Sequence, residues 1–287
     1  MTARLLLCSD LDRTLLPNGP QPESPDARAR FARFVSRPGV VLVYVTGRHR
    51  ELVEQAIANY RLPRPDFVIG DVGTTIFEVT QNGWHLQQAW QAEIAPDWAG
   101  LEHADISALL AGNRLLRLQE TAKQNIHKLS YYVPLDVDQV ALLDDVRQCL
   151  VKHHVNASLV WSVDEPAGIG LLDVLPARAN KLHAVEFLMQ HCRFSYTNTV
   201  FAGDSGNDLA VLSSAIPAVL VANASAEVRA AAQQQAAALG NSSRLYLAVG
   251  GLLGMNGNYS AGVLEGVVHF MPPTRLWLDR QGTGQAE

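Results

Sequence analysis

Two aspartates close the first apolar segment of the chain and restrict what can be built around it. Residues 5–8 are typical of a buried strand, and Asp10 and Asp12 follow them, separated by Leu11. Because side chains alternate along a strand, we expect the two acids to point the same way while Leu11 points back into the sheet. Two carboxylates so near to each other need a cation between them, or one of them keeps its proton. The pair therefore suits a Mg²⁺ site or a nucleophile beside a general acid, unless it is only a polar turn or the capped start of a helix.

The next segments alternate between helix and strand patterns. Residues 40–45 and 67–69 are continuous apolar runs, as in parallel strands that are buried on both faces. Apolar residues at helical spacing fill residues 25–35 and 49–60 between these strands. This alternation indicates an α/β fold with a doubly wound, Rossmann-like parallel sheet.

From about Trp84 the pattern changes, and apolar and polar residues begin to alternate. The segments that alternate lie near residues 115–119, 128–133, 157–163 and 169–174. Alternation predicts an antiparallel sheet with one covered face. We therefore expect a discontinuous core domain of residues 1–83 and 175–287, interrupted by an α+β domain of residues 84–174. Trp84, Trp90 and Trp98 in the inserted part suggest either ordinary core packing or a platform on which a sugar stacks.

Polar residues also follow other elements of the predicted core. They are Thr46, Gly47 and Arg48 after the second strand, Lys181 at the start of a helix over residues 181–191, and Gly203-Asp204-Ser205-Gly206-Asn207-Asp208 after a strand over residues 199–202. Ligands of open α/β sheets bind at the carboxyl ends of the strands. Acidic strand ends together with a hydroxyl and a cation suit a magnesium-bound phosphoryl group.

The order and spacing of these groups resemble the motifs of the haloacid dehalogenase superfamily of phosphatases. Motif I matches Asp10-Leu11-Asp12-Arg13-Thr14, motif II matches Thr46, motif III matches Lys181, and motif IV matches the segment from Gly203 to Asp208. The insertion resembles the larger α/β cap of the Cof-like branch, which implies a cap domain that selects the substrate. Within that branch the chain is most similar to sucrose-phosphate phosphatases. The segments behind this similarity are Asp71-Val72-Gly73-Thr74, Leu118-Gln119, His127-Lys128-Leu129-Ser130-Tyr131-Tyr132-Val133, Asp173-Val174-Leu175-Pro176 and Val221-Ala222-Asn223-Ala224.

The resemblance implies a role for each core residue. Asp10 would attack phosphorus and become an aspartyl phosphate, and Asp12 would protonate the leaving sugar oxygen and later deprotonate a water. Mg²⁺ would be held by Asp10, the backbone carbonyl of Asp12 and Asp204, with Asp208 supporting them. The implied substrate-binding residues are Thr46, Gly47, Arg48, Gln119, His127, Lys128, Lys181, Asn207 and Asn223.

Ordinary structural roles stay open for several of these residues. Asp208 could cap the helix that follows it, and Arg48 could form a salt bridge on a helix face. His127 and Lys128 could be polar residues at a strand edge rather than partners of sugar hydroxyls. Gln119 and Asn223 could likewise have structural roles rather than contacts with the substrate.

Composition excludes some partners. The net charge is -5 and Lys or Arg residues form no run, which speaks against nucleic acid or an anionic membrane as the main partner. We expect no transmembrane helix and no signal peptide, and the 3 scattered cysteines fit a reducing cytoplasm. A monomer or weak homodimer is expected, with a disordered tail after Pro272.

The sequence thus predicts a cytoplasmic Mg²⁺-dependent phosphatase that hydrolyses a sugar phosphate, with a disaccharide phosphate such as sucrose 6-phosphate as the preferred substrate. Mannosylfructose phosphate, glucosylglycerol phosphate and mannosyl phosphoglycerate are alternatives, as is a sugar phosphomutase. A receiver-type signalling module would need neither Asp12 nor a large insertion. A sugar-phosphate sensor is the remaining alternative without catalysis.

Overall fold

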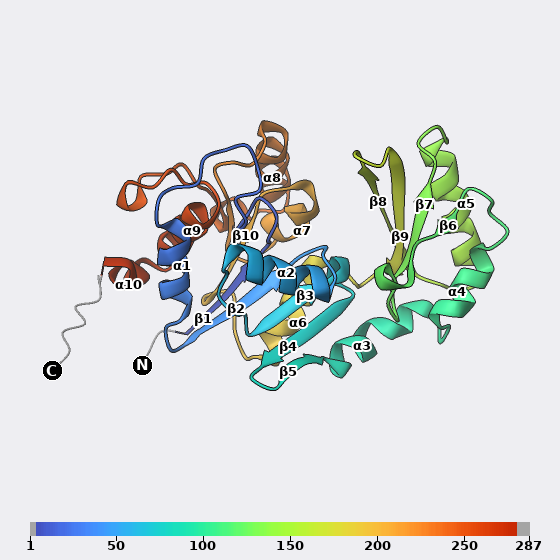
Figure 1. Cartoon of the computed structure of the whole chain (residues 1–287), viewed down its shortest axis with the longest axis horizontal. Coiled ribbons are helices and arrows are strands. Elements are labelled where there is room, and N and C mark those ends of the chain that lie inside the picture. The colour runs from blue at the N-terminus through green and yellow to red at the C-terminus, as the bar shows by residue number, and fades with distance from the viewer. Residues whose placement is uncertain (1–3, 280–287) are drawn as a thin grey trace.

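Within residues 4–279, which the computed structural model describes, eight strands form the larger of two sheets (Figure 1). In spatial order these strands are β12 (Leu245–Leu247), β11 (Ala218–Leu220), β10 (Thr199–Gly203), β1 (Leu5–Ser9), β2 (Val40–Val45), β3 (Phe67–Gly70), β4 (Thr75–Thr80) and β5 (Gly83–Leu86). The strands from β12 to β3 are parallel, whereas β4 and β5 add an antiparallel hairpin at one edge. The predicted α/β fold with a Rossmann-like parallel sheet is confirmed, and the hairpin is an addition to it.

Helices cover both faces of the larger sheet. They are α1 (Ala27–Val35), α2 (Arg50–Tyr60), α3 (Gln88–Ile94), α6 (Lys181–His191), α7 (Leu209–Leu212), α8 (Ala226–Ala238), α9 (Ser260–Phe270) and α10 (Arg275–Asp279). Short 3-10 turns complete the chain at η1 (Asp71–Gly73), η2 (Ala95–Trp98), η3 (Thr121–Lys123), η4 (Gly206–Asp208), η5 (Ser242–Arg244), η6 (Leu252–Gly254) and η7 (Pro272–Thr274).

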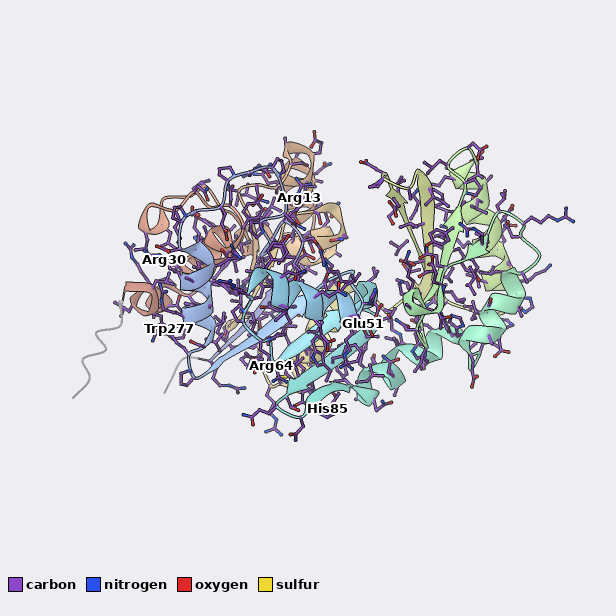
Figure 2. The ribbon with its side chains drawn as sticks, in the orientation of Figure 1. Arg13, Arg30, Glu51, Arg64, His85 and Trp277 are labelled. Carbon is purple, nitrogen blue, oxygen red and sulfur yellow. The ribbon has the colours of Figure 1, made fainter. Side chains whose placement is uncertain are left out.

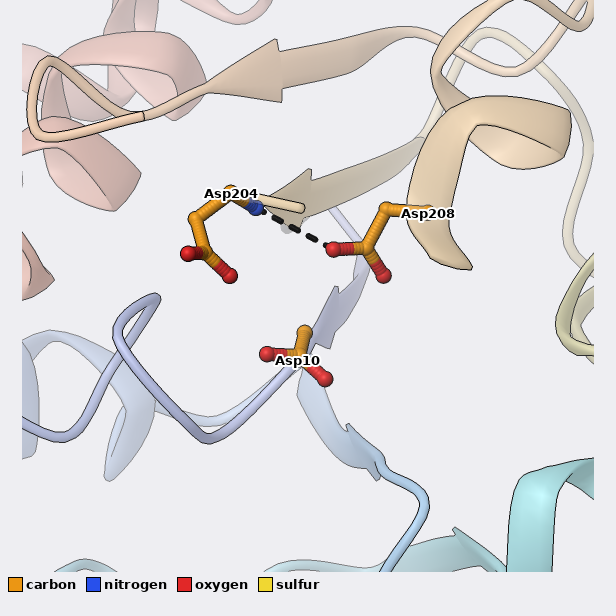
Figure 3. Close-up of side chains that lie close together, drawn as sticks. All are labelled: Asp10, Asp204 and Asp208. Carbon is orange, nitrogen blue, oxygen red and sulfur yellow. Dashed lines mark hydrogen bonds between the residues drawn. The ribbon is translucent and has the colours of Figure 1, made fainter. Parts of the chain in front are cut away.

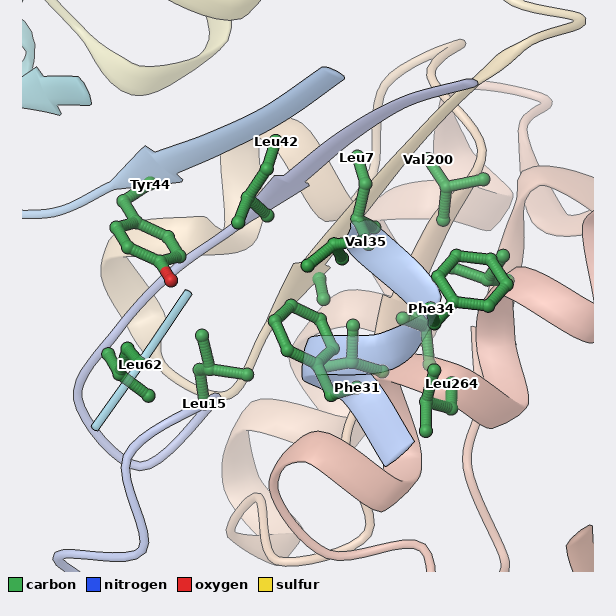
Figure 4. Close-up of a cluster of buried hydrophobic side chains, with 14 of the residues drawn as sticks. Leu7, Leu15, Phe31, Phe34, Val35, Leu42, Tyr44, Leu62, Val200 and Leu264 are labelled. Atoms are coloured by element: carbon green, nitrogen blue, oxygen red, sulfur yellow. The ribbon is translucent and has the colours of Figure 1, made fainter. Parts of the chain in front are cut away.

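The central strand β1 explains the layers on either side of it. Leu5 and Leu7 point into a cluster with side chains of α1 and α9, part of which is drawn in Figure 4. Leu6 and Cys8 point to the opposite face, where α6 and α7 pack. Every residue of β1 is buried, and each large aliphatic side chain so placed stabilises the fold by about 1.5–3 kcal/mol. The strand end that carries Asp10 is therefore rigidly placed.

A smaller antiparallel sheet stands beside the larger one (Figure 1). Its order is β6 (Arg117–Leu118), β7 (Leu129–Val133), β9 (Ile169–Pro176) and β8 (Ala157–Asp164). Helices α4 (His103–Leu110) and α5 (Gln139–Lys152) pack on one face of it and bury a separate apolar cluster. We refer to this sheet with α4 and α5 as the cap, and to the larger sheet with its helices as the core.

The boundary between the two parts differs in detail from the expected one. Strand β5 crosses the boundary expected between residues 83 and 84 and pairs with β4 in the core. Helix α3 then leads from β5 toward the cap (Figure 1). The division of the chain into a catalytic core and a cap that selects the substrate remains a prediction.

Two other expectations about the chain have clear outcomes. Trp90 and Trp98 are fully buried, which confirms core packing for them over a sugar platform. The expected disorder after Pro272 is wrong for residues 272–279, because η7 and α10 form there and Trp277 packs on Phe34 with ring centroids 5.4 Å apart. Figure 2 shows Trp277 at the end of the core; residues 280–287 lie outside the described residues. Among the described helices, none has the length and apolar character needed to cross a bilayer.

Candidate active site

Three aspartates converge where β1 and β10 end side by side. These strands are parallel neighbours, so Asp10 and Asp204 leave the same edge of the sheet. Asp208 returns to this edge through η4, and its Oδ2 accepts the backbone N–H of Asp204 at 3.1 Å and that of Ser205 at 3.2 Å. One carboxylate oxygen from each aspartate lies within 4.8 Å of the others (Figure 3). All three side chains are buried.

Lys181 is a buried cation in the same cluster. Helix α6 begins with this residue, because the side chain of Asn180 caps the helix by accepting the N–H of His183 at 3.0 Å. Lys181 Nζ donates to Asp10 Oδ1 at 2.8 Å, to Asp208 Oδ1 at 2.7 Å and to Asn207 Oδ1 at 2.9 Å. These bonds use all three N–H groups of the ammonium, so its position beside Asp10 is fixed.

Burial sets the protonation of this cluster. It raises the pKa of Asp10 to about 7, although the ion pair with Lys181 opposes the shift. Burial, together with the charge of Asp208, raises the pKa of Asp204 to about 6. Burial acts to lower the pKa of Lys181, but Asp10 and Asp208 outweigh it and the net shift is upward. The cluster thus combines hard oxygen donors with an excess of negative charge, which fits a bound divalent cation.

Asp12 has a different partner from Asp10. Arg48 Nε donates to Asp12 Oδ2 at 2.7 Å, Arg48 Nη2 donates to Oδ1 at 2.6 Å, and Asn18 Nδ2 donates to Oδ1 at 2.8 Å. Partial burial acts to raise the pKa of Asp12, but Arg48 and Asn18 outweigh it and the net shift is downward. Arg48 therefore forms a salt bridge with Asp12, the second aspartate of motif I, and the expected helix-face role does not apply because α2 begins only at Arg50.

The end of β2 supplies the predicted hydroxyl at the same edge of the sheet. β1 and β2 pair in parallel with Ser9 opposite Tyr44, which brings Thr46 and Gly47 alongside the residues that follow β1. Thr46 is buried, and its Oγ1 accepts the backbone N–H of Arg48 at 3.2 Å. This bond fixes the turn that carries Gly47 and Arg48.

A cavity of about 450 Å³ lies between this edge of the core and the cap. Such a volume is typical of a site for a small molecule. Of the predicted site residues, the cavity is lined by Gly47, Arg48, Lys181 and Asn207 from the core and by Gln119 and Lys128 from the cap. Residues more than 100 positions apart in the sequence therefore share one site.

The cap wall of the cavity combines polar side chains with the apolar side chains of Val160, Trp161 and Leu171, and the alternation along β9 adds Asp173 to it. Leu172 and Val174 point into the cap's own apolar cluster, whereas Asp173 lines the cavity. Lys128 Nζ donates to Ser130 Oγ at 2.6 Å and lies 3.4 Å from Asp173 Oδ1. The cavity face of the cap thus offers charged and hydroxyl groups.

His127 and Asn223 are not among the residues that line this cavity. His127 Nδ1 lies 2.8 Å from Gln91 Oε1. Asn223 Nδ2 donates to the carbonyl of Arg13 at 2.6 Å, and its Oδ1 accepts the N–H of Tyr259 at 2.8 Å. Both residues therefore have partners within the protein, and their contacts with substrate stay a prediction. Asn223 braces the loop that follows Asp12.

Asp71 lines the cavity but was absent from the predicted site residues. It follows β3, and the pair Asp71 and Val72 adopts positive φ angles of 51° and 61°. Such a conformation costs about 1–3 kcal/mol for a residue other than glycine and is concentrated at functional sites. Burial raises the pKa of Asp71. Its place directly after a buried strand was the available signal, the same signal that identifies Asp10.

Comparisons with known proteins place this geometry in a family. The model of the sucrose-6F-phosphate phosphohydrolase family matches residues 3–271. A HAD-like hydrolase of Nitrosococcus oceani is 54% identical over the whole chain and 76% of its own length. Mannosylfructose-phosphate phosphatase of Agrobacterium fabrum is 30% identical over 80% of the chain and 87% of its own length. Sucrose-phosphatase 1 of Nicotiana tabacum is also 30% identical, but the match covers only 52% of that protein.

A solved structure supports the same placement. The sucrose-phosphatase of Synechocystis, determined with sucrose and phosphate, is similar with a TM-score of 0.71 and 26% identity. The match covers 94% of the present chain and 98% of that one. A haloacid dehalogenase-like hydrolase from Bacillus subtilis shares the fold with a TM-score of 0.66 at 18% identity.

Proposed function

The chain belongs to the sucrose-6F-phosphate phosphohydrolase family of the haloacid dehalogenase superfamily, and we propose that it hydrolyses a disaccharide phosphate, such as sucrose 6-phosphate, with the help of Mg²⁺. Family membership makes it a phosphatase, a phosphoric monoester hydrolase. The metal, the covalent intermediate and the sugar are the parts that we propose. The observation that carries the proposal is one cavity that is lined both by Lys181, which is bonded to Asp10, and by polar side chains of the cap.

In the proposed first step, a carboxylate oxygen of Asp10 attacks phosphorus while the bond from phosphorus to the sugar oxygen breaks. Asp12, in its protonated form, gives its proton to that oxygen, and the sugar leaves as an alcohol. Water then attacks the phosphorus of the aspartyl phosphate and gives a proton to Asp12. Inorganic phosphate leaves and Asp10 is restored, so one phosphate ester and one water become one alcohol and one phosphate.

The main obstacle to this chemistry is charge, because a carboxylate attacks an anionic phosphoryl group. Lys181 and Thr46 would hold phosphoryl oxygens, since Lys181 Nζ is bonded to Asp10 and Thr46 follows β2, the strand beside β1. Asp10, Asp204 and the backbone carbonyl of Asp12 would hold Mg²⁺, with Asp208 in support. When bound, the metal would supply positive charge that offsets the negative charge of the phosphoryl group.

A sugar as leaving group is supported by the cap side of the cavity. Gln119, Lys123, Lys128 and Asp173 there supply donors and acceptors for hydroxyl groups. Two relatives at 30% identity are named for sucrose phosphate and mannosylfructose phosphate, so the latter is the main alternative substrate.

Phosphate release from a substrate panel tests the proposal. The panel contains sucrose 6-phosphate, mannosylfructose phosphate, glucosylglycerol phosphate, mannosyl phosphoglycerate and hexose monophosphates, each with Mg²⁺ and with a chelator. We expect kcat/KM to be highest for a disaccharide phosphate and to vanish with the chelator. Faster turnover of hexose monophosphates than of every disaccharide phosphate would refute the substrate assignment. Isomerised sugar phosphate without free phosphate would identify a phosphomutase instead.

A further inference from the structure

We propose that His127 is a positioning residue that fastens the cap to the core beside the active-site cavity. The inference rests on the proposed function, because it concerns how the cap is held to receive a sugar. His127 directly precedes Lys128, which lines the cavity, yet His127 itself does not line it and is only 8% exposed.

The side chains around His127 form a closed circuit of hydrogen bonds. His127 Nδ1 lies 2.8 Å from Gln91 Oε1, and Gln91 Nε2 donates to the carbonyl of Thr74 at 2.9 Å. Asn125 Nδ2 donates to Thr74 Oγ1 at 2.8 Å, and Asn125 Oδ1 accepts the backbone N–H of His127 at 2.9 Å. Thr74 belongs to the core, whereas Asn125 and His127 belong to the loop that enters β7 of the cap.

This circuit determines which nitrogen of His127 matters. Because the amide nitrogen of Gln91 donates to the carbonyl of Thr74, its oxygen must accept from His127. His127 Nδ1 therefore carries the hydrogen in the circuit, and Nε2 takes no part. The His127 ring packs edge-to-face with Trp98, with ring centroids 5.4 Å apart and planes inclined by 69°.

Both ends of the circuit adjoin the cavity. On the core side, Thr74 follows the turn that contains Asp71, and Thr74 Oγ1 donates to the carbonyl of Asp71 at 2.9 Å. On the cap side, His127 precedes Lys128 in the chain. Asp71 lines the cavity from the core, and Lys128 lines it from the cap. The circuit consequently sets the spacing between the core wall and the cap wall, where a sugar would lie.

Substitutions that imitate one ring nitrogen at a time separate this role from direct contact with the substrate. Asparagine places an N–H near the position of Nδ1, whereas glutamine places one near Nε2. His127→Asn can keep the bond to Gln91, and His127→Gln cannot. His127→Leu removes both nitrogens. His85→Leu, in edge strand β5 at the outer side of the core (Figure 2), is the matched control.

The experiment compares kcat and KM for the best disaccharide phosphate with those for p-nitrophenyl phosphate, which has no sugar. For His127→Leu we expect KM for the disaccharide phosphate to rise by about 10-fold, while kcat/KM for p-nitrophenyl phosphate changes by less than about 2-fold. His127→Asn should restore KM to within about 3-fold of the wild type, and His127→Gln should not. His85→Leu should leave all values unchanged.

Several outcomes would overturn the inference. If His127→Gln restores KM and His127→Asn does not, His127 is a ligand of the substrate through Nε2. If kcat/KM falls equally for the disaccharide phosphate and for p-nitrophenyl phosphate, the role of His127 is merely structural. If His127→Leu fails to fold, Gln91→Met breaks the same circuit and carries the same expectation. If the wild type cleaves a disaccharide phosphate and the variants have the same KM as the wild type, only the role of His127 is refuted. A wild-type protein that cleaves p-nitrophenyl phosphate but no sugar phosphate refutes the proposed function and this inference with it.

Discussion

Arg48 donates a hydrogen bond to each carboxylate oxygen of Asp12, with Nε 2.7 Å from Oδ2 and Nη2 2.6 Å from Oδ1. A two-pronged bond of this kind fixes the carboxylate in orientation as well as in place. It also favours the charged form of Asp12, whereas the proposed acid step needs the protonated form. In the proposed reaction an incoming phosphate, which is an anion, would compete with Asp12 for Arg48, and substrate binding would thereby help Asp12 to take up its proton.

Replacing Arg48 by Met is expected to extend activity to higher pH. Without its cationic partner Asp12 has a higher pKa, so it stays protonated further into the alkaline range. The alkaline limb of kcat/KM should move upward, while the maximal kcat falls by about 10-fold or more because Asp12 is no longer oriented. Profiles of kcat/KM between about pH 5 and pH 9 measure both effects. Arg50→Met is the control, because it removes an ion pair with Glu54 that lies outside the cavity lined by Lys181. If the alkaline limb of kcat/KM stays in place in Arg48→Met, the prediction is wrong.

Asp10→Asn should abolish turnover and leave the fold intact. The amide is no nucleophile toward phosphorus, so we expect kcat to fall by more than about 10³-fold. Lys181 still has Asp208 and Asn207 as partners, and the variant relieves repulsion among three close carboxylates. The metal-free unfolding midpoint should thus equal or exceed that of the wild type. Turnover above about one hundredth of the wild-type rate would remove Asp10 as the nucleophile.

Lys181→Met should strongly destabilise the metal-free protein. It leaves the carboxylates of Asp10 and Asp208 buried without their cation, a change that typically costs about 3–5 kcal/mol. Urea unfolding with a chelator measures this loss, with Lys152→Met at the end of α5 as an exposed control. Added Mg²⁺ should narrow the difference in free energy, since it offers a second source of positive charge. A loss no larger than that of the control would show that Lys181 does not balance the cluster.

Mg²⁺ should raise the unfolding midpoint through the aspartate cluster. A ligand at about 100 times its Kd adds about 2.7 kcal/mol to the free energy of unfolding. The pKa of Asp10 is about 7 and that of Asp204 about 6, so protons compete with the metal and its effect should shrink as pH falls through this range. Asp204→Asn should remove the effect, whereas Asp144→Asn on α5 should keep it. Equal stabilisation of both variants would place the metal elsewhere.

The core of the site could be predicted from the sequence because local patterns determine it. Asp10 directly follows the apolar strand β1, and the rule that parallel strands end at one edge of the sheet brings Asp204 and Thr46 close to it. The partner of Arg48 was not predictable in this way, since Asp12 lies 36 positions earlier and only the folded chain brings the two together.

His127 and Asn223 show more clearly what could not be predicted from the sequence. Periodicity can assign His127 to a strand edge, but not the amide of Gln91, 36 positions away, that receives its hydrogen. Asn223 likewise has backbone partners at Arg13 and Tyr259, which no spacing rule connects to it. Polar side chains were therefore recognised as important, whereas their partners depended on tertiary contacts.

The burial of His127 also predicts how the free energy of unfolding depends on pH. Burial lowers the pKa of His127 below its usual 6.5, so the folded protein keeps the ring neutral where the unfolded chain takes up a proton. The unfolded state then binds more protons, and the free energy of unfolding falls as pH drops below about 6.5. Asp10 and Asp204 act in the opposite sense, because the folded state holds their protons more tightly.

A comparison with His127→Asn isolates the histidine, since asparagine keeps the N–H toward Gln91 and does not titrate. The opposing effects of Asp10 and Asp204 are common to both proteins and cancel in the difference. Urea unfolding at about pH 7.5 and pH 5 should show a larger loss of free energy in the wild type than in the variant. His85→Asn, at the exposed edge of β5, should follow the wild type. Parallel curves for the wild type and His127→Asn would mean that the ring is protonated in the folded state as readily as in the unfolded chain, and that burial does not hold it neutral.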